Sequence, residues 1–383
     1  MALRIEDYAL IGDMRTAALV GKDGSIDWLC LPRFDSGASF AALLGSPDNG
    51  RWLLAAKGES KRRYEEHTLV LVTEWRTERG VAEVRDFMPV GTEHPGVVRM
   101  VRGLEGEVEM EMELVIRFDY GSSIPWVSRH DGVIRAIAGP HALWLHSDVP
   151  TEGKGMTTQA KFTVRAGEVV RFSLGWYPSH KDLPPRFDPD AKLAETVTWW
   201  REWASKCEYD GEWRDQIVRS LITLKALTYQ PTGGIVAAPT TSLPERIGGV
   251  RNWDYRYCWL RDATFTLYAL LMSGYRDEAA AWRDWLERAI AGDPSQLQIV
   301  YGPAGERRLW EIELPWLPGY EQSKPVRIGN QAFMQLQLDV YGEVLDAMYQ
   351  ARRQGIVADQ RGWAVELELM TFVEAHWQKP DSG

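Results

Sequence analysis

The sequence predicts two regions of different fold class, an all-β region at the N-terminus followed by an all-α region. Between residues 107 and 119, apolar residues such as Met110 and Met112 alternate with glutamates. A period of two places one row of side chains on a core and the other in water, as in an antiparallel sheet. Beyond a proline-rich connector near residue 180, apolar residues recur at helical spacing. No strand-length runs fall regularly between the helical segments, so a βαβ pattern is not predicted.

The β region begins with a turn signal at Lys22-Asp23-Gly24, which precedes the first apolar run. Many short runs separated by turn residues favour a sandwich or a barrel over a parallel sheet. We therefore expect an antiparallel β-sandwich over residues 1–180. The strand candidates cover residues 25–31, 68–75, 81–90, 97–104, 107–119, 132–137 and 162–174.

The connector contains Pro178, Pro184, Pro185 and Pro189 among charged residues. Such a stiff polar segment is typical of a junction between domains. We therefore predict a sandwich over residues 1–180, a linker with a linker helix over 181–210, and a helical domain over 211–383.

In the helical region, Trp213, Ile217, Leu221, Leu224 and Thr228 share one helical face. Asn330 is predicted to cap a long helix. The later helix candidates cover residues 262–273, 276–291, 330–353 and 361–377.

Composition and charge exclude several classes of function. The 383 residues carry a formal net charge of −10, which gives no electrostatic help to nucleic-acid or anionic-membrane binding. No run approaches the roughly 18 apolar residues of a membrane span. No secretory signal is visible, and the three cysteines show no CxxC spacing. We expect a cytoplasmic protein that binds neither nucleic acid nor a membrane.

Motifs for cofactors, metals and nucleophilic catalysis are also missing. The sequence has no G-x-x-x-x-G-K-[ST], no G-x-G-x-x-G after a strand and no G-x-S-x-G. The seven histidines are dispersed, and His141 and His146 have a poor spacing for zinc. We therefore expect no cofactor and no metal.

The densest chemistry lies in residues 251–262, which hold four aromatics, three arginines and two aspartates before a predicted helix. In one interpretation Asp262 caps that helix and the aromatics belong to the core. In the other, these residues bind a sugar, because rings pack on apolar C–H faces while arginine and carboxylate groups pair with hydroxyls.

Two further loops accompany this segment, at residues 231–245 and 310–320. The chain has 18 Trp, and ten of them lie between Trp199 and Trp316, in the same region as these loops. Tryptophans near the connector are more consistent with core packing. The tryptophans proposed as ligand-binding are Trp253, Trp259, Trp310 and Trp316.

Residues 11–35, from Ile11-Gly-Asp-Met-Arg to Pro-Arg-Phe-Asp35, resemble the trehalase-like N-terminal domain of glycoside hydrolase family 15. Residues 252–262, Asn-Trp-Asp-Tyr-Arg-Tyr-Cys-Trp-Leu-Arg-Asp, resemble that family's hallmark segment. Two further segments also resemble segments of that family, namely Glu313-Leu-Pro-Trp-Leu-Pro-Gly-Tyr320 and Gln337-Leu-Asp-Val-Tyr-Gly-Glu-Val-Leu-Asp346. The resemblance implies a β-sandwich followed by an (α/α)6 barrel, of which residues 211–383 would form the N-terminal part.

The resemblance also implies a substrate site for α-glucosides, either trehalose or the ends of α-glucans. Arg261 and Asp262 would hold the hydroxyls of the terminal glucose, and Trp259 and Trp316 would wall the pocket. Trp253 and Glu313 complete the expected substrate-binding residues.

Members of this family invert the anomeric centre with two glutamates, whose carboxyl groups stand about 6.5–9.5 Å apart. No glutamate of this sequence matches either segment that carries them, so we assign no catalytic residue. We expect the chain to be the N-terminal part of a longer enzyme and to be inactive alone. Exposed flanks of the half barrel would favour self-association. A non-catalytic glycan-binding protein and a glycoside phosphorylase are the alternatives.

Overall fold

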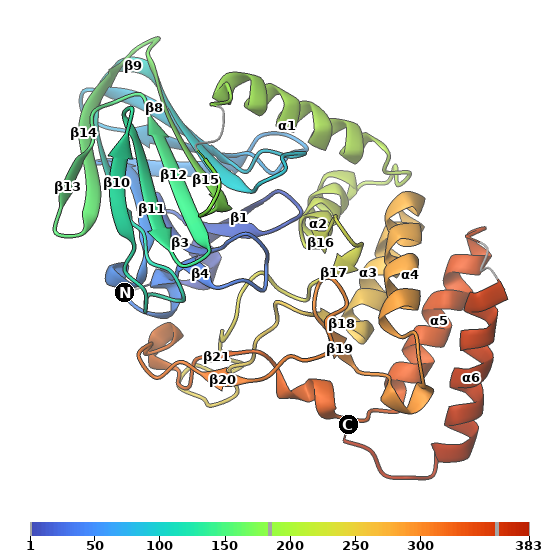
Figure 1. Cartoon of the computed structure of the whole chain (residues 1–383). Helices are drawn as coiled ribbons and strands as arrows, with labels where there is room; N and C mark the ends of the chain where they lie inside the picture. Colours follow the sequence, from blue (N-terminus) through green and yellow to red (C-terminus); the bar gives the residue numbers. More distant parts are fainter. Residues whose placement is uncertain (1, 183–185, 357–359, 383) are drawn as a thin grey trace. The chain divides into compact units, whose positions relative to one another are not determined.

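The computed structural model describes residues 2–182, 186–356 and 360–382. The chain forms two compact units (Figure 1). The sheet unit comprises Met1–Ala204 and Trp316–Lys324, and the helical unit comprises Ser205–Pro315 and Pro325–Gly383. An antiparallel sheet region followed by a helical region is the order that the sequence predicts.

The sheet unit contains fifteen strands within the described residues, all paired antiparallel apart from one isolated bridge. The main order is β1-β2-β3-β5-β9-β15-β12-β11-β10, and β6-β7-β8 and β13-β14 add to β9. The strands are β1 Tyr8–Gly12, β2 Ala17–Gly21, β3 Ser25–Cys30, β4 Ala38–Phe40, β5 Arg51–Ala56, β6 Glu59–Tyr64, β7 Leu71–Arg76, β8 Gly80–Phe87, β9 Gly96–Val115, β10 Trp126–His130, β11 Val133–Ala138, β12 His141–Ser147, β13 Glu152–Lys154, β14 Thr157–Arg165 and β15 Val169–Pro178. Short 3-10 helices η1 (Ile5–Asp7), η2 (Ala42–Leu44) and η3 (Pro47–Asn49) join them.

The long strand β9 connects the two halves of the sheet, as Figure 1 shows. Its first half pairs with β8 and β15, and its second half pairs with β5 and β14. The sequence predicts two strands here, at 97–104 and 107–119. They are one strand because Gly106 continues the chain with φ +58, where a Cβ would collide with the Arg79 carbonyl.

One apolar core serves both halves of the sheet. Met110 and Met112 of β9 contribute to it, as the alternation predicts, together with Trp52 of β5 and Leu174 of β15. The neighbouring Glu109 is exposed, and Glu111, between the two methionines, is half-buried. The alternating pattern is therefore confirmed by the burial of one row of side chains.

Helix α1 (Pro189–Ser205) belongs to the sheet unit, although the sequence predicts residues 181–210 as a linker with a helix. Val197 packs against Val70, Phe87 and Val98 of the sheet. This apolar contact anchors the helix to the sheet unit, whose first segment ends at Ala204, within the predicted linker 181–210.

A second segment of the sheet unit comes from far along the chain. Within residues 316–324, which include η5 (Tyr320–Gln322), the Gly319 N–H donates to the Leu44 carbonyl at 2.9 Å. The Tyr320 hydroxyl donates to the Leu3 carbonyl at 3.1 Å. Residues 316–320, the second half of the loop predicted at 310–320, therefore belong to the sheet unit.

The helical unit consists of helices that pack on their neighbours, α3 on α4 and α5, and α5 on α6. Within the described residues its elements are α2 Arg214–Ala226, β16 Thr228–Tyr229, β17 Gly234–Ile235, β18 Cys258–Trp259, α3 Leu260–Met272, α4 Arg276–Ala289, η4 Pro294–Gln296, β19 Val300–Tyr301, β20 Ile312–Glu313, β21 Arg327–Ile328, η6 Gln331–Met334, α5 Asp339–Arg353 and α6 Gln360–His376. Asn330 caps the short η6 by accepting from the Ala332 N–H, and the predicted helix 330–353 begins only at Asp339. The chain at Gln335 is extended, which separates the two helices.

Two helices of this unit present exposed apolar side chains. On α3 these are Phe265, Tyr268 and Met272, and on α6 they include Trp363 and Leu367. Neither α3, α6 nor another helix of the described residues has the length and apolarity needed to cross a membrane.

Buried Asp13 provides a pH-dependent element in the sheet unit. Its Oδ1 accepts from the Arg15 and Thr16 N–H groups, whereas its Oδ2 has no hydrogen-bond partner among the described residues. Burial raises the pKa of this carboxyl to about 6.

A folded-state pKa above the unfolded value means that Asp13 contributes stability below about pH 4 and loses that contribution as the pH rises through about 6. Asp13→Asn keeps the accepting oxygen and removes the charge. We expect the variant to gain on the order of 2–3 kcal/mol over the wild type between pH 4 and pH 7.5. Urea unfolding at both pH values measures this difference, and parallel stability profiles of the two proteins would contradict it.

Candidate functional site

The segment that precedes α3 is extended, and its side chains alternate between two environments. Asn252, Asp254 and Arg256 are buried, whereas the alternate side chains of Trp253 and Tyr255 line a cavity. A period of two in an extended chain produces this separation. The segment then continues through β18, which pairs with β19, into the first turn of α3.

The cavity has a volume of about 600 Å³ and lies entirely in the helical unit. Aromatic rings, two arginines, two glutamates and several amides converge on it. Its lining residues are Glu245, Arg251, Trp253, Tyr255, Trp259, Arg261, Glu311, Asn330, Gln331, Ala332, Gln335, Gln337 and Ser382. Rings with many hydrogen-bonding groups suit a ligand that has both apolar faces and hydroxyls.

A buried ion pair lies directly behind the cavity wall. The Asp254 carboxylate accepts from Arg256 Nε at 2.8 Å and from Nη2 at 2.6 Å, and both side chains are almost fully buried. Its Oδ2 also accepts from the Gly329 N–H at 3.1 Å. The Asp254 carbonyl accepts from Asn330 Nδ2 at 3.0 Å. Asp254 therefore fixes the segment of Trp253 to the loop that carries Asn330.

Arg327 of β21 holds a second part of the wall. Its guanidinium lies 4.9 Å from the centre of the Trp253 ring, and its Nε lies 3.1 Å from Glu311 Oε1. It also donates from Nη1 to the Val250 carbonyl at 2.9 Å. These contacts orient the ring of Trp253 and one cavity carboxylate together.

Three of the predicted site residues, Trp253, Trp259 and Arg261, line this cavity together. The Arg261 guanidinium lies 5.9 Å from the centre of the Trp259 ring. Burial, with Glu245 and Asp262 adding to it, raises the pKa of the Tyr255 hydroxyl, which keeps that group a neutral donor.

Asp262 lies beside these residues in the first turn of α3. It is not the N-cap, a position that Trp259 occupies, so the capping interpretation of Asp262 is wrong. Its Oδ2 instead accepts from Arg261 Nη2 at 3.3 Å, and both side chains are 48% exposed. The pair is thus accessible to a ligand.

The remaining two predicted residues lie elsewhere. Glu313 of β20 is exposed, and its carboxylate lies 3.4 Å from Arg327 Nη2. Trp316 belongs to the sheet unit, where its indole Nε1 donates to the Tyr120 carbonyl at 3.1 Å. Their roles in substrate binding stay predictions.

Several cavity residues were not predicted from the sequence. Glu245 ends the loop 231–245 and pairs with Arg251 at 3.1 Å, and Glu311 is held by Arg327. Glu343 of α5 does not belong to the cavity lining, but its charge lies close enough to Arg261 to interact with it. Burial raises the pKa of the Glu343 carboxyl, and Asp339 and Asp346 add to that effect.

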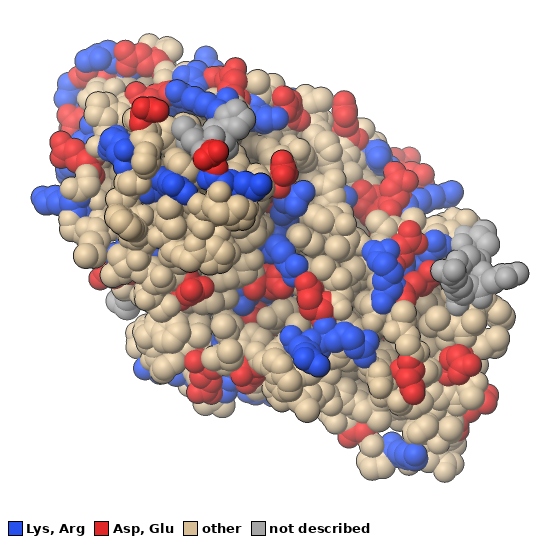
Figure 2. All heavy atoms as spheres, in the orientation of Figure 1, with Lys and Arg blue, Asp and Glu red and all other residues tan. Residues whose placement is uncertain are grey.

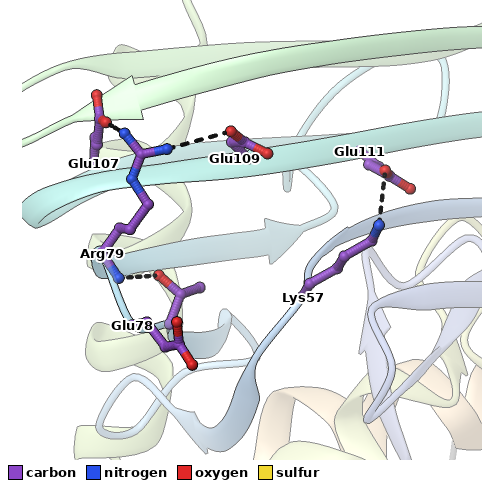
Figure 3. Close-up of a pocket in the computed structure, with 7 residues that line it drawn as sticks. Lys57, Glu78, Arg79, Glu107, Glu109 and Glu111 are labelled. Atoms are coloured by element: carbon purple, nitrogen blue, oxygen red, sulfur yellow. Dashed lines mark hydrogen bonds and ion pairs between the residues drawn. The ribbon is translucent and has the colours of Figure 1, made fainter.

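The sheet unit has a charged cavity of about 360 Å³ near the β8 turn, which Figure 3 shows. Arg79 forms ion pairs with Glu107 and Glu109, and Lys57 lies 4.0 Å from Glu111. None of its lining residues that the structure describes is aromatic, so these residues offer no ring face to a sugar.

The part of the chain that the structure describes contains no group of three His, Cys, Asp or Glu placed to bind a metal. On the face drawn in Figure 2, acidic and basic side chains are interspersed, without a broad area of either sign.

Family models match both the N-terminal sheet region and the C-terminal helical region of the chain. Residues 1–175 match the model described as "Trehalase-like, N-terminal", and residues 211–383 match that of glycosyl hydrolases family 15. The junction between the two matches falls in the segment that contains α1.

Two relatives are proteins called trehalase. The chain is 35% identical to that of Mycolicibacterium smegmatis, over 99% of this chain and 62% of the relative. It is also 35% identical to that of Mycobacterium tuberculosis, over 99% of this chain and 60% of the relative. The chain therefore spans about three fifths of the length of these relatives.

The fold resembles that of a bacterial glucoamylase solved in complex with acarbose. The TM-score is 0.67 at 11% sequence identity, over 100% of this chain and 61% of the other. The overall fold is therefore glucoamylase-like, with an antiparallel sheet region and a helical region. The two family matches and the trehalase relatives show that residues 211–383 belong to glycosyl hydrolases family 15 and that residues 1–175 form a trehalase-like N-terminal region.

Proposed function

We propose that this protein takes part in the inverting hydrolysis of α-glucosidic bonds, with trehalose as the first substrate candidate and α-glucan ends as the second. The observation that carries the proposal is that Trp253, Trp259 and Arg261 line one cavity together with several amide side chains, which can hydrogen-bond to sugar hydroxyls. The relatives called trehalase, at 30–35% identity, support trehalose as the first candidate.

In this proposal the rings of Trp253 and Trp259 contact the apolar faces of glucose. Arg261 donates to its hydroxyls, and the Asp262 carboxylate accepts from them and orients Arg261. A site built to pair with hydroxyls rejects ligands that lack them, because its polar groups would remain unpaired. The helical unit would form part of an (α/α)6 barrel around this glucose.

Hydrolysis with inversion needs a proton donor and a base on opposite sides of the sugar. The two cavity glutamates do not suit either role, because Arg251 engages Glu245 and Arg327 engages Glu311. We therefore propose that the 383-residue chain alone binds an α-glucoside without turning it over. A glycan-binding protein without catalysis is the alternative that the same cavity supports.

Calorimetry of the purified chain with trehalose, maltose and glucose tests the proposal. We expect saturable binding of at least one of these sugars, and we expect Asp262→Ala to weaken it at least tenfold, because a charge-assisted hydrogen bond contributes about 1.5–3 kcal/mol. Asp284→Ala is the matched control, because Asp284 is an aspartate on α4 outside the cavity.

Unchanged sugar affinity of Asp262→Ala would contradict the subsite assignment. Steady release of glucose from trehalose or maltose by the unmodified chain would contradict the proposed lack of turnover.

The exposed apolar faces of α3 and α6 support the further proposal that the chain associates with itself through them. Analytical ultracentrifugation tests this proposal, and a monomer at all accessible concentrations would contradict it.

A further inference from the structure

The sheet unit contains a second kind of cavity, with apolar walls and a cationic group. Its volume is about 370 Å³, within the range of small-molecule sites. Leu114, Ile116, Ile124 and Val127 supply apolar walls, and Arg117 and Lys154 supply positive charge. Among the described residues that line it, none is acidic.

Arg117 is the unusual member of this lining, because it is only 8% exposed. Its Nη1 donates to the Ile116 carbonyl at 2.8 Å and to the Met156 carbonyl at 3.3 Å. Its Nε and Nη2 make no hydrogen bond to any residue that the structure describes, and no carboxylate there forms an ion pair with it. Burial lowers the pKa of the Arg117 guanidinium, and only the exposed Asp48 opposes this effect.

Two other deeply buried arginines among the described residues show what Arg117 lacks. Arg99 forms a bidentate pair with Asp86, and Arg256 forms one with Asp254. A buried guanidinium without such a partner is costly. The partner that would complete this site is an anion from outside the chain.

We propose that this cavity binds a small amphipathic carboxylate, such as a medium-chain fatty acid. Its carboxylate would pair with Arg117, and its apolar body would lie along Ile116, Ile124 and Val127. A carboxylate fits because a guanidinium binds it through two parallel hydrogen bonds. A free sugar fits poorly, because the apolar walls would leave most of its hydroxyls unpaired.

The rim of the cavity supports an apolar body. Ile124, Val127 and Met156 are each at least half exposed, which is unusual for large apolar side chains grouped around one opening. Exposed apolar groups that surround a concave site mark ligand-binding surfaces more often than scattered ones do.

The cavity wall is continuous with the turn that holds Trp316. Arg117 precedes this turn and Ile124 follows it, and Phe118 and Ser123 bridge its two ends. Within the turn the Tyr120 carbonyl accepts from Trp316 Nε1 at 3.1 Å. We therefore expect occupation of the cavity to perturb the indole N–H of Trp316.

The test uses the full chain and three probes, namely octanoate below its micelle concentration, 1-octanol and acetate. We expect octanoate to bind saturably, at least tenfold more tightly than 1-octanol or acetate, since it alone has both the charge and the apolar body. We also expect octanoate to shift the Trp316 indole resonance, which Trp316→Phe identifies by its loss. Equal affinity for octanoate and 1-octanol, or no saturable octanoate binding, would overturn the proposal.

Arg117→Met should remove the preference for octanoate over 1-octanol and retain 1-octanol binding. Arg129→Met is the matched control, because Arg129 is an exposed arginine of β10 that does not line the cavity. An Arg117→Met variant that keeps the octanoate preference would overturn the proposal. If that variant does not fold, the comparison of probes on the unmodified chain still decides it. The outcome is independent of glucoside binding, which concerns the helical unit.

Discussion

Replacing Asp86 by alanine is expected to destabilise the sheet unit by about 3–5 kcal/mol, because it leaves the Arg99 guanidinium buried without a counter-charge. Arg99 is fully buried, and its Nε donates to Asp86 Oδ1 at 2.7 Å. It also donates to the carbonyls of Trp52 and Gly24, at 2.6 and 2.8 Å. The ion pair therefore joins β8 and β9 to β5 and to the turn before β3.

The effect should appear as a fall in the midpoint of thermal unfolding of about 2–4 °C per kcal/mol. Scanning calorimetry of the full chain measures it. The double variant Asp86→Leu with Arg99→Met should recover much of the loss, because it removes both charges and fills the space with apolar atoms.

Glu111→Ala is the matched control for Asp86→Ala. Glu111 lies on the same strand as Arg99, but its ion pair with Lys161 is exposed to solvent. An exposed pair contributes about 0–1 kcal/mol. Similar losses in Asp86→Ala and Glu111→Ala would show that burial of the Arg99 pair is not what stabilises the sheet unit.

The sequence pattern predicted the β region well where side chains alternate between core and water. Met110 and Met112 face the core because the period of two persists over a whole strand. The continuity of β9 through Gly106 was not predictable in this way, because a glycine with φ > 0 is equally typical of a turn. Likewise, the docking of α1 depends on Val197 meeting Val70 and Phe87, a contact between distant segments.

In the candidate site too, the sequence indicated the residues of one local segment but not the residues that distant loops bring to it. The density of rings and charges in residues 251–262 predicted a common substrate site for Trp253, Trp259 and Arg261, and these three residues line one cavity. Glu245 and Glu311 come from other loops, and their approach depends on tertiary pairing with Arg251 and Arg327.

One signal for the buried pair was present in the sequence. If residues 251–257 are taken as extended, Arg251, Trp253 and Tyr255 fall on one side and Asp254 and Arg256 on the other. Residue type alone could not separate these two groups, because Asp and Arg serve both as sugar ligands and as buried partners. The structure shows that these two charges satisfy each other, whereas Arg261 and Asp262 form a separate pair whose side chains are half exposed.

The buried Asp254–Arg256 pair lies behind the cavity wall, so its loss should affect both stability and sugar binding. Asp254→Ala is expected to destabilise the helical unit by about 3–5 kcal/mol, because Arg256 would be buried without its partner and the Gly329 N–H would lose its acceptor. The loop that carries Asn330 would lose an anchor, so sugar binding should be lost as well. Scanning calorimetry and sugar titration of the same protein measure both effects.

Two further variants separate stability from ligand contact. Asp254→Asn keeps the shape but removes the charge that Arg256 requires, so it should lose a large part of the same stability. Glu245→Ala breaks the exposed pair with Arg251 on the cavity wall. We expect its free energy of unfolding to stay within about 1 kcal/mol of the wild-type value. If Asp254→Ala unfolds like Glu245→Ala and still binds sugar, the pair behind the wall does not position the cavity. If Asp254→Ala loses both stability and binding while Glu245→Ala keeps its stability, Asp254 is the residue on which the geometry of Trp253 and Asn330 depends.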